Sequence, residues 1–396
     1  MPEGILPPAT AAVSDSLLRV ERLTEAAELD AITPAWNALA ADAPQGLPQL
    51  SAAWVRSYLE TVGADARISV HVAFAGLALV GVLALVKRAH PRLGGRAPLI
   101  GPPRDHHTRS GDALLHPVFA PLALRSLLAS VRAREEPCFG LELRGVRDTS
   151  PTLAALGEAG PFGVVVRTAD ESGSYVKVDG DLPAFRAGLS DNFRRNLRKA
   201  GNRVAKAPGT RFRRDVGPAA DPATLDVFLE VEASGWKGRG GTAIAQDPTL
   251  VRFYRTLVAR LAAAGWLEWH RIELEGRTAA IHLGARLGRS LVLLKIAYDE
   301  AFARVGPGNL LFDHVVEAEF AERRVDEINC MTDMPWHRNW EMPRSAYTDV
   351  VIHPRRPLPL LAGVVPARTK AWLRGIPFVR ELAARRAAAR PAGAVE

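Results

Sequence analysis

Residues 266–299 constrain the fold more than any other stretch, because they read as three consecutive strands joined by tight turns. WLEWHRIEL is followed by a turn at Glu275-Gly276, TAAIHLGARL by a turn at Gly288, and SLVLLKIAYD completes the set. Apolar segments of this length with glycine-containing turns between them predict an antiparallel meander. The chain therefore contains at least one mainly antiparallel sheet.

Helical patterns flank this meander. PATLDVFLEVEASGW and TLVRFYRTLVARLAAAG precede it, and NLLFDHVVEAEFAERR follows it after EAFARVGPG. Their apolar residues recur at helical spacing. The strand VDEINCM, the aromatic-rich loop TDMPWHRNW and the strand SAYTDVVIH come next. This order predicts an α/β unit whose sheet is mixed but mostly antiparallel and is flanked by helices.

A second α/β pattern occupies the N-terminal part. Its longest uncharged apolar run, VAFAGLALVGVLALV at 72–86, has 15 residues and falls short of the roughly 20 that span a bilayer. With Gly76 inside it, this run predicts two strands and a turn. Helical patterns lie in TPAWNALAADA, LSAAWVRSYLETVG and LALRSLLASVRAREE, strands in LLRVERL and PCFGLELRG, and Pro/Gly-rich loops around 91–104. Residues 151–180 add a helix and the strands FGVVVRT and SYVKV.

The length of 396 residues allows two or three domains. We predict a first domain at 16–150, a second at 151–353 and a basic amphipathic tail at 354–396. The start, MPEGILPP, lacks the basic and apolar segments of a secretory signal. The two cysteines, Cys138 and Cys330, suit a reducing compartment. We therefore expect a cytoplasmic location, with attachment to the inner membrane face.

No group of residues predicts a metal site. His, Cys and carboxylate residues nowhere occur at the spacing typical of zinc ligands. The triplet DHH at 105–107 is interpreted as part of a surface loop, because it lies between prolines and Thr108.

The net charge of +8 is unevenly distributed. Residues 181–214 hold ten Lys/Arg and two acids, and residues 354–396 hold nine Lys/Arg and two acids. These two windows carry +15 together, so the rest of the chain carries −7. A slightly acidic body with two basic patches favours local contacts with phosphates or anionic lipid headgroups.

Each basic patch has its own pattern. In SDNFRRNLRKAGNRV, Ser190 or Asp191 can cap a helix whose apolar residues share one face and whose arginines occupy the rest. In the tail, prolines prevent one long helix. Short amphipathic pieces on an anionic membrane surface suit that composition, and a solvated tail is the alternative.

RVGPGN at 304–309 joins the meander to the next helix. Free backbone N–H groups and the positive end of a helix stabilise an anion, and glycines allow close approach. The segment is therefore a candidate phosphate seat, and a plain turn is the alternative.

The order helix, helix, meander, helix, strand resembles the GNAT acyltransferase fold. FLEVEASGWKGRGGTAI, KIAYDEAFARVGPGNLL and DNFRRNLRKAGNRV are similar to segments of the CelD/Fem-like (BcsL-type) acetyltransferase family. INCMTDMPWHRNWE departs from the family pattern, because Thr332 replaces a glycine and a Tyr-Lys pair is missing. The resemblance is good from about 185 to 350 and weaker over 16–150. It implies tandem GNAT-like domains with a degenerate N-terminal copy.

The resemblance also implies acyl-CoA or acetyl-CoA as co-substrate, without a metal. Its pyrophosphate would lie on Arg304, Gly306, Pro307, Gly308 and Asn309, although Arg304 is one position late for the usual fingerprint. Acyl transfer to an amine needs a neutral amine, a polarised carbonyl and a proton for the leaving thiolate.

Four residues are candidates for this chemistry. Tyr298 could protonate the thiolate or be a buried structural tyrosine. Asp299 could orient or deprotonate the amine or cap the loop. Asp333, which ends the next strand, is a candidate base or amine anchor, and His337 in the loop that follows is a candidate general base. His282 lies among apolar neighbours and is interpreted as a core histidine.

Candidate substrate-binding residues lie outside this group. Trp236, Lys237 and Arg239 could line an acceptor pocket. The arginines of the basic helix have the chemistry for a phosphorylated or lipid-linked acceptor; they are Arg194, Arg195 and Arg198.

Three functions follow from these features. The first is an N-acyltransferase that moves an acyl group from acyl-CoA to an amine on a cell-envelope precursor, either an exopolysaccharide amino sugar or a lipid or sphingoid amine. The second is an aminoacyl-tRNA-dependent transferase of the Fem type. The third is an inactive, membrane-associated scaffold or sensor. DNA is not among the expected partners.

Overall fold

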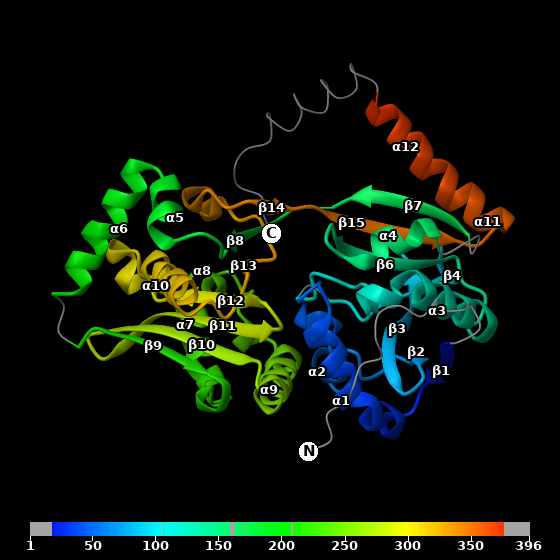
Figure 1. The fold of residues 1–396 in the computed structure, drawn as a ribbon, viewed down its shortest axis with the longest axis horizontal. Coiled ribbons are helices and arrows are strands. Elements are labelled where there is room, and N and C mark those ends of the chain that lie inside the picture. Colours follow the sequence, from blue (N-terminus) through cyan, green and yellow to red (C-terminus); the bar gives the residue numbers. More distant parts are fainter. Residues whose placement is uncertain (1–17, 106, 159–162, 171, 207–208, 376–396) are drawn as a thin grey trace.

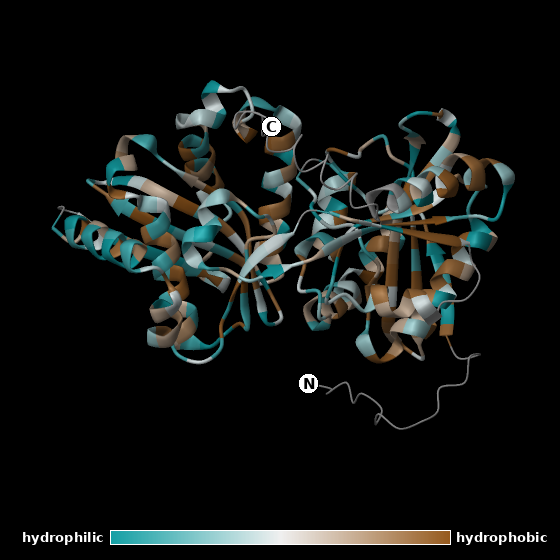
Figure 2. Ribbon diagram, turned by 90° about the horizontal axis from the view of Figure 1, so that it is seen from above, coloured by the Kyte–Doolittle hydropathy of each residue, from teal (hydrophilic) through white to brown (hydrophobic). Residues whose placement is uncertain are grey.

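Two mixed sheets flanked by helices form this protein (Figure 1). The computed structural model describes residues 18–105, 107–158, 163–170, 172–206 and 209–375. The first sheet has the order β1-β2-β3-β4-β6-β15-β7, with β5 paired to β3, and the second has the order β14-β8-β13-β12-β11-β10-β9. Figure 2 shows that the strands are largely hydrophobic and that the outer helices carry hydrophilic residues. The predicted α/β class is confirmed.

The first unit consists of the first sheet and its helices. Its elements are β1 (Leu18–Leu23), α1 (Ala26–Asp42), α2 (Ala52–Leu59), β2 (Ile68–Ala75), β3 (Ala78–His90), β4 (Gly94–Gly101), β5 (Leu114–Leu115), α3 (Ala120–Arg134), β6 (Gly140–Arg147), α4 (Pro151–Glu158), β7 (Val164–Ala169) and β15 (Tyr347–His353). The hairpin predicted in the run 72–86 is confirmed, with Gly76 at φ +62 in its turn. The loop predicted around 91–104 is wrong in part, because β4 pairs with β3 despite its glycines and proline.

The second unit consists of the second sheet and its helices. Its elements are β8 (Gly173–Lys177), α5 (Leu182–Gly188), α6 (Asp191–Val204), β9 (Arg211–Val216), α7 (Thr224–Ser234), α8 (Trp236–Arg239), α9 (Pro248–Ala263), β10 (Leu267–Leu274), β11 (Arg277–Leu287), β12 (Ser290–Tyr298), α10 (Pro307–Glu322), β13 (Glu327–Asn329) and β14 (Arg344–Ser345). The predicted meander is β10, β11 and β12, paired antiparallel. Sequence reasoning missed β9, a basic edge strand that pairs with β10.

The two units repeat one topology. In the first, β1 to β4 pair antiparallel in sequence and β4 runs parallel to β6. In the second, β9 to β12 pair in the same way and β12 runs parallel to β13. Helices α1 and α2 follow the first strand of one unit, as α7 and α9 do in the other, and α3 matches α10. The predicted tandem arrangement is thereby confirmed.

Each sheet contains a strand that pairs with neighbours far away in the sequence. β15 lies between β6 and β7 in the first sheet, whereas β8 joins β13 and β14 in the second. The predicted domain boundaries at 150 and 353 therefore divide the first sheet, since they place β7 and β15 in the second domain. Pairing between strands that are distant in sequence leaves no local signal from which to predict it. We propose instead a first domain of 18–169 with 347–375, and a second of 173–345.

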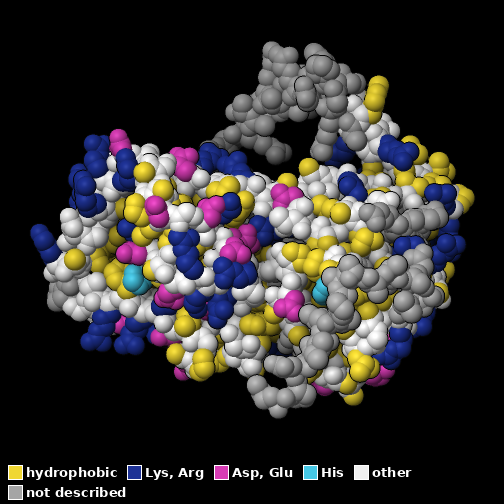
Figure 3. All heavy atoms as spheres, in the orientation of Figure 1, with side chains coloured by type: hydrophobic (Ala, Val, Ile, Leu, Met, Phe, Trp, Pro, Cys, Tyr) yellow, Lys and Arg dark blue, Asp and Glu magenta, His cyan; other side chains and the backbone are white. Residues whose placement is uncertain are grey.

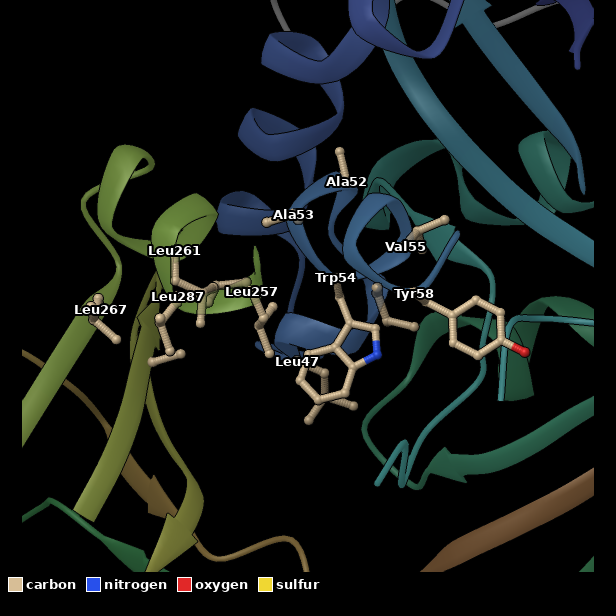
Figure 4. Close-up of a cluster of buried hydrophobic side chains, with 14 of the residues drawn as sticks. Leu47, Ala52, Ala53, Trp54, Val55, Tyr58, Leu257, Leu261, Leu267 and Leu287 are labelled. Atoms are coloured by element: carbon tan, nitrogen blue, oxygen red, sulfur yellow. The ribbon is translucent and has the colours of Figure 1, made fainter. Parts of the chain in front are cut away.

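One hydrophobic core continues from the first unit into the second. α2 packs against α9, and Figure 4 shows Trp54 lying toward Leu257 and the neighbouring leucines of the second unit. Gly288 has φ +50, and a Cβ there would lie 2.3 Å from the carbonyl oxygen of Ala41. The units therefore approach too closely at this turn for a side chain.

The C-terminal segment forms one continuous helical run after β15. It contains α11 (Pro357–Pro359), a π-helical turn (Leu360–Val364) and α12 (Val365–Gly375). The expectation that prolines would divide it is wrong for these residues, because the wide turn immediately before Pro366 accommodates a residue without an N–H group. The remainder of the predicted tail, 376–396, lies outside the described residues. Among the residues that the structure describes, no helix is long and apolar enough to cross a bilayer.

Candidate functional site

A cavity of about 740 Å³ opens where β12 and β13 separate. The two strands pair only from Ser290 opposite Glu327 to Val292 opposite Asn329. β12 nevertheless continues along β11 as far as Tyr298. Residues 293–298 consequently line the cavity with one strand edge unpaired by β13. Such an edge can donate and accept hydrogen bonds with an extended ligand.

The N-terminus of α10 forms one end of this cavity. Gly306 is its N-cap in the left-handed conformation, at φ +60, and Pro307 occupies the first helical position. The amides of Gly308 and Asn309 have no intrahelical acceptor there, and no hydrogen bond joins them to another described residue. A Cβ on Gly306 or Gly308 would meet no atom within 4 Å. The geometry therefore leaves two free N–H groups and open space for an anion.

A bulge in β12 determines which of its side chains face α9 and which face α10. Leu283 lies opposite Lys295 and Gly284 lies opposite Leu293, so Leu294 is an extra residue. Leu283 belongs to the core under α9, whereas Leu293 packs with the α10 residue Phe312. Lys295 thus leaves the sheet on the α9 face, and its ammonium lies 5.9 Å from the centre of the Tyr254 ring.

The first unit closes the cavity on that side. His107 and Arg109, from the connection between β4 and α3, line it together with Gln49. A ring nitrogen of His107, Nδ1, lies 3.0 Å from the Tyr254 hydroxyl. Arg109 pairs with Asp170 at 2.6 Å. The interpretation of DHH as a mere surface loop is therefore wrong for His107, since chain folding brings this loop to the other unit.

The matching connection of the second unit is much shorter, running from Asp299 to Gly306 as a 3-10 turn (Glu300–Val305). In the first unit, none of the described residues from 102 to 119 adopts the left-handed conformation that opens α10. The first copy therefore lacks the glycine-capped helix start of the second. Its long connection serves instead as a wall of the cavity.

Eight of the predicted site residues line the cavity. They are Trp236, Lys237, Tyr298, Gly306, Pro307, Gly308, Asn309 and His337. Tyr298 is 42% exposed and lies opposite Ala280, which packs on α10. His337 is buried, which lowers its pKa to about 4. Because its Nδ1 accepts a hydrogen bond from the Met334 amide, its ring proton is assigned to Nε2 at neutral pH.

The other predicted site residues do not line this cavity. They are Arg194, Arg195, Arg198, Arg239, Asp299, Arg304 and Asp333. Asp299 caps the 3-10 turn through the Ala301 amide and pairs with Arg277. Asp333 accepts a hydrogen bond from Ser174 at 3.1 Å and lies in a smaller neighbouring cavity. Both carboxylates therefore have structural partners. The cap made by Asp299 agrees with one of the two roles expected for it, whereas the partners of Asp333 were not expected.

The basic side chains divide in the same way. Arg239 pairs with Glu300 at 2.8 Å, and Lys237 pairs with Glu232 at 2.7 Å. Arg195 and Arg198 are exposed on α6, which packs beside α10. Figure 3 shows Lys and Arg side chains gathered over this helix. The arginines of α6 thus lie outside the cavity, on the surface of the unit that holds it.

His282 was expected in the core, and it is 2% exposed. It also lines the cavity, with Nδ1 lacking a hydrogen-bond partner among the described residues. Burial lowers its pKa to about 3, so the imidazole is neutral. Lys295 was not predicted from sequence at all, because nothing local marks a bulged strand position.

Comparisons with known proteins agree with this architecture. A family model described as an acetyltransferase (GNAT) domain matches residues 191–338. No curated protein matches the chain. The structure of FemX is similar with a TM-score of 0.56 and 13% identity, over 86% of this chain and 99% of that chain. L-PGS from Bacillus licheniformis is similar with a TM-score of 0.50 and 13% identity, over 87% and 96% of the two chains.

At such low identity these two structures show the fold alone. The family match carries the activity: residues 191–338 form a GNAT-type acetyltransferase domain, and the chain is an acyltransferase of this type. Membership of the CelD-like family within that type stays a prediction.

Proposed function

We propose that this protein transfers an acyl group from acyl-CoA to an amine carried by a cell-envelope precursor, such as an amino sugar or a lipid. One observation carries the proposal: the free amides of Gly308 and Asn309 and the unpaired edge of β12 open into the same cavity. A phosphate-bearing donor with an amide-containing arm fits that combination.

The residues of the cavity support a direct transfer. The amides at the start of α10 would hold the donor's pyrophosphate, and the edge of residues 293–298 would pair with the amide groups of its arm. The neutral amine nitrogen then attacks the thioester carbon and the C–S bond breaks. The nitrogen loses one proton to solvent as the amide forms, and the thiolate takes up one proton. Tyr298 lies on the α10 face and could supply that proton through its hydroxyl. In its neutral form His337 presents an N–H donor rather than a strong base.

Tyr298→Phe tests this role. Removing the hydroxyl should lower kcat about 100-fold while KM for acyl-CoA stays near the wild-type value, because the hydroxyl acts on the leaving group. Steady-state thiol release measures both constants. Tyr175→Phe on β8, outside the cavity lining, is the control and should leave them unchanged. Unaltered kcat in Tyr298→Phe would remove the tyrosine from the mechanism.

The function itself is tested by thiol release from short- and long-chain acyl-CoAs with a panel of amines. We expect release that depends on both substrates and an N-acylated product by mass spectrometry. Absence of release across the panel would contradict the proposal. The exposed arginines of α6 suit the phosphates of a tRNA as well as those of a lipid-linked acceptor. Charged tRNA as the required donor would establish the aminoacyl-tRNA alternative.

We further propose that the helix 357–375 rests on an anionic membrane surface. Four large apolar side chains are each at least 51% exposed along it: Leu358, Leu361, Val365 and Trp372. Val365 and Trp372 are seven residues apart within α12 and therefore lie on one side of that helix. Residues 354–375 contain basic residues and no acid. Apolar contact and charge attraction then act together.

Vesicle sedimentation checks this contact. The protein should sediment with phosphatidylglycerol-containing vesicles and remain in solution with pure phosphatidylcholine. The double variant Leu361→Glu/Trp372→Glu should bind the vesicles about tenfold or more weakly, since charges replace two apolar groups that would enter the membrane. Leu77→Glu, at a 95% exposed position in the β2–β3 turn, is the control. Binding that survives the double variant would exclude this helix as the membrane contact.

A further inference from the structure

The residues that line the cavity include more cations than carboxylates. Three cations line it, Arg109, Lys237 and Lys295, against two carboxylates, Glu232 and Glu300. Both carboxylates are engaged, Glu232 by Lys237 and Glu300 by Arg239. Arg109 is paired with Asp170 from outside the lining. Among the described residues, no carboxylate is hydrogen-bonded to Lys295.

Lys295 stands in surroundings that disfavour an unpaired cation. Its ammonium lies 5.9 Å from the centre of the Tyr254 ring, and His107 and apolar residues of β12 line the same cavity. Burial, reinforced by Lys237, lowers the pKa of Lys295 to about 8, so it remains mostly protonated at neutral pH. Glu232 and Asp105 favour the charge of Lys295 without being hydrogen-bonded to it. A cation held in a mainly apolar cavity without a direct ion pair is costly unless an anion binds to it.

The position of Lys295 separates it from the donor's phosphates. Those phosphates would lie at the start of α10, whereas the bulge at Leu294 turns Lys295 to the α9 face. On that face the cavity is closed by His107 and Arg109 of the first unit. The α9 side is therefore the region left for the second substrate.

We propose that Lys295 anchors a carboxylate or phosphate carried by the acceptor, so that the enzyme selects amines bearing an anionic group. This inference rests on the proposed acyl transfer, because it concerns the acceptor of that reaction. The test of anion binding to Lys295 does not depend on acyl transfer. A charge-assisted hydrogen bond in a partly desolvated site is stronger than one in water. Neutral amines of the same size would leave the cation unpaired.

Three amines with the same carbon spacer isolate the anionic group: 2-aminoethanol, 2-aminoethyl phosphate and 3-aminopropanoate. The first readout is labelling of Lys295 by trinitrobenzenesulfonate, followed by peptide mass spectrometry, with the exposed Lys87 as internal reference. The ratio of Lys295 to Lys87 labelling corrects for reagent consumed by the free amines. An anionic amine at twice its Kd should lower this ratio about threefold by mass action, whereas 2-aminoethanol should leave it unchanged. Stronger protection of Lys295 by 2-aminoethyl phosphate would indicate a phosphate, and stronger protection by 3-aminopropanoate would indicate a carboxylate.

The second readout is kcat/KM for thiol release. Lys295→Gln should lower it about tenfold more for the preferred anionic amine than for 2-aminoethanol, as loss of one charged hydrogen bond implies. Lys295→Arg should keep the preference for the anionic amine.

Equal protection by all three amines, or no protection by any, would overturn the inference. An equal fall for all three in Lys295→Gln would identify the lysine as a base instead. If no amine is turned over, the acyl-transfer proposal fails while the labelling result still decides the anion site.

Discussion

Replacing Gly308 by Asp is expected to weaken acyl-CoA binding at least about 100-fold, or about 2.8 kcal/mol, while the protein stays folded. The new carboxylate would stand in the open space beside the free amides of the first turn, where the donor's phosphates are proposed to lie. Isothermal titration with acyl-CoA measures the loss. The unfolding temperature should not fall, because an acidic residue in the first turn of a helix is favourable.

Gly308→Ala is the matched control. Its methyl group meets no protein atom within 4 Å and adds no charge, so it should weaken acyl-CoA binding much less than Gly308→Asp does. It should also gain about 0.5–1 kcal/mol of stability from the lower entropy of the unfolded chain. Normal acyl-CoA binding by Gly308→Asp would show that the phosphates lie elsewhere.

Replacing Arg147 by Ala is expected to cost about 3–5 kcal/mol of the free energy of unfolding. Arg147 ends β6 in the first unit and donates two hydrogen bonds, of 2.7 and 2.6 Å, to Glu327 of β13 in the second. Its side chain is only 4% exposed, so removing it leaves a largely buried carboxylate without its counter-ion. Urea unfolding at neutral pH measures the change.

A neighbouring exposed pair provides the comparison. Arg289 binds Asp326 at 2.6 Å, but both side chains are more than half exposed. Arg289→Ala should therefore change the free energy of unfolding by no more than about 1 kcal/mol. Equal effects of the two substitutions would mean that the Arg147 pair does not hold the units together.

Features with a local cause were predictable from the chain. The turns at Glu275-Gly276 and Gly288 were predicted because a backbone with positive φ favours glycine, and the meander followed from them. The helix start at Gly306–Asn309 was also predicted, because it is defined by a few consecutive residues, and its role as a phosphate site stays a prediction. Roles for Asp299 and Asp333 were predicted from position alone, and the structure gives both carboxylates other partners.

Features that depend on distant pairing were not predictable. β15 joins the first sheet although it follows the whole second unit, and the loop of His107 reaches a cavity built about 190 residues later around Lys295. Strict alternation along β12 would place Lys295 on the same face as Leu293, toward α10. The extra residue Leu294 reverses that alternation, and a bulge shows itself only once the partner strand is in place. Local backbone preferences thus specified the helices and strands and the glycine-capped start of α10, whereas strand pairing across the chain selected the side chains that face the α9 side of the cavity.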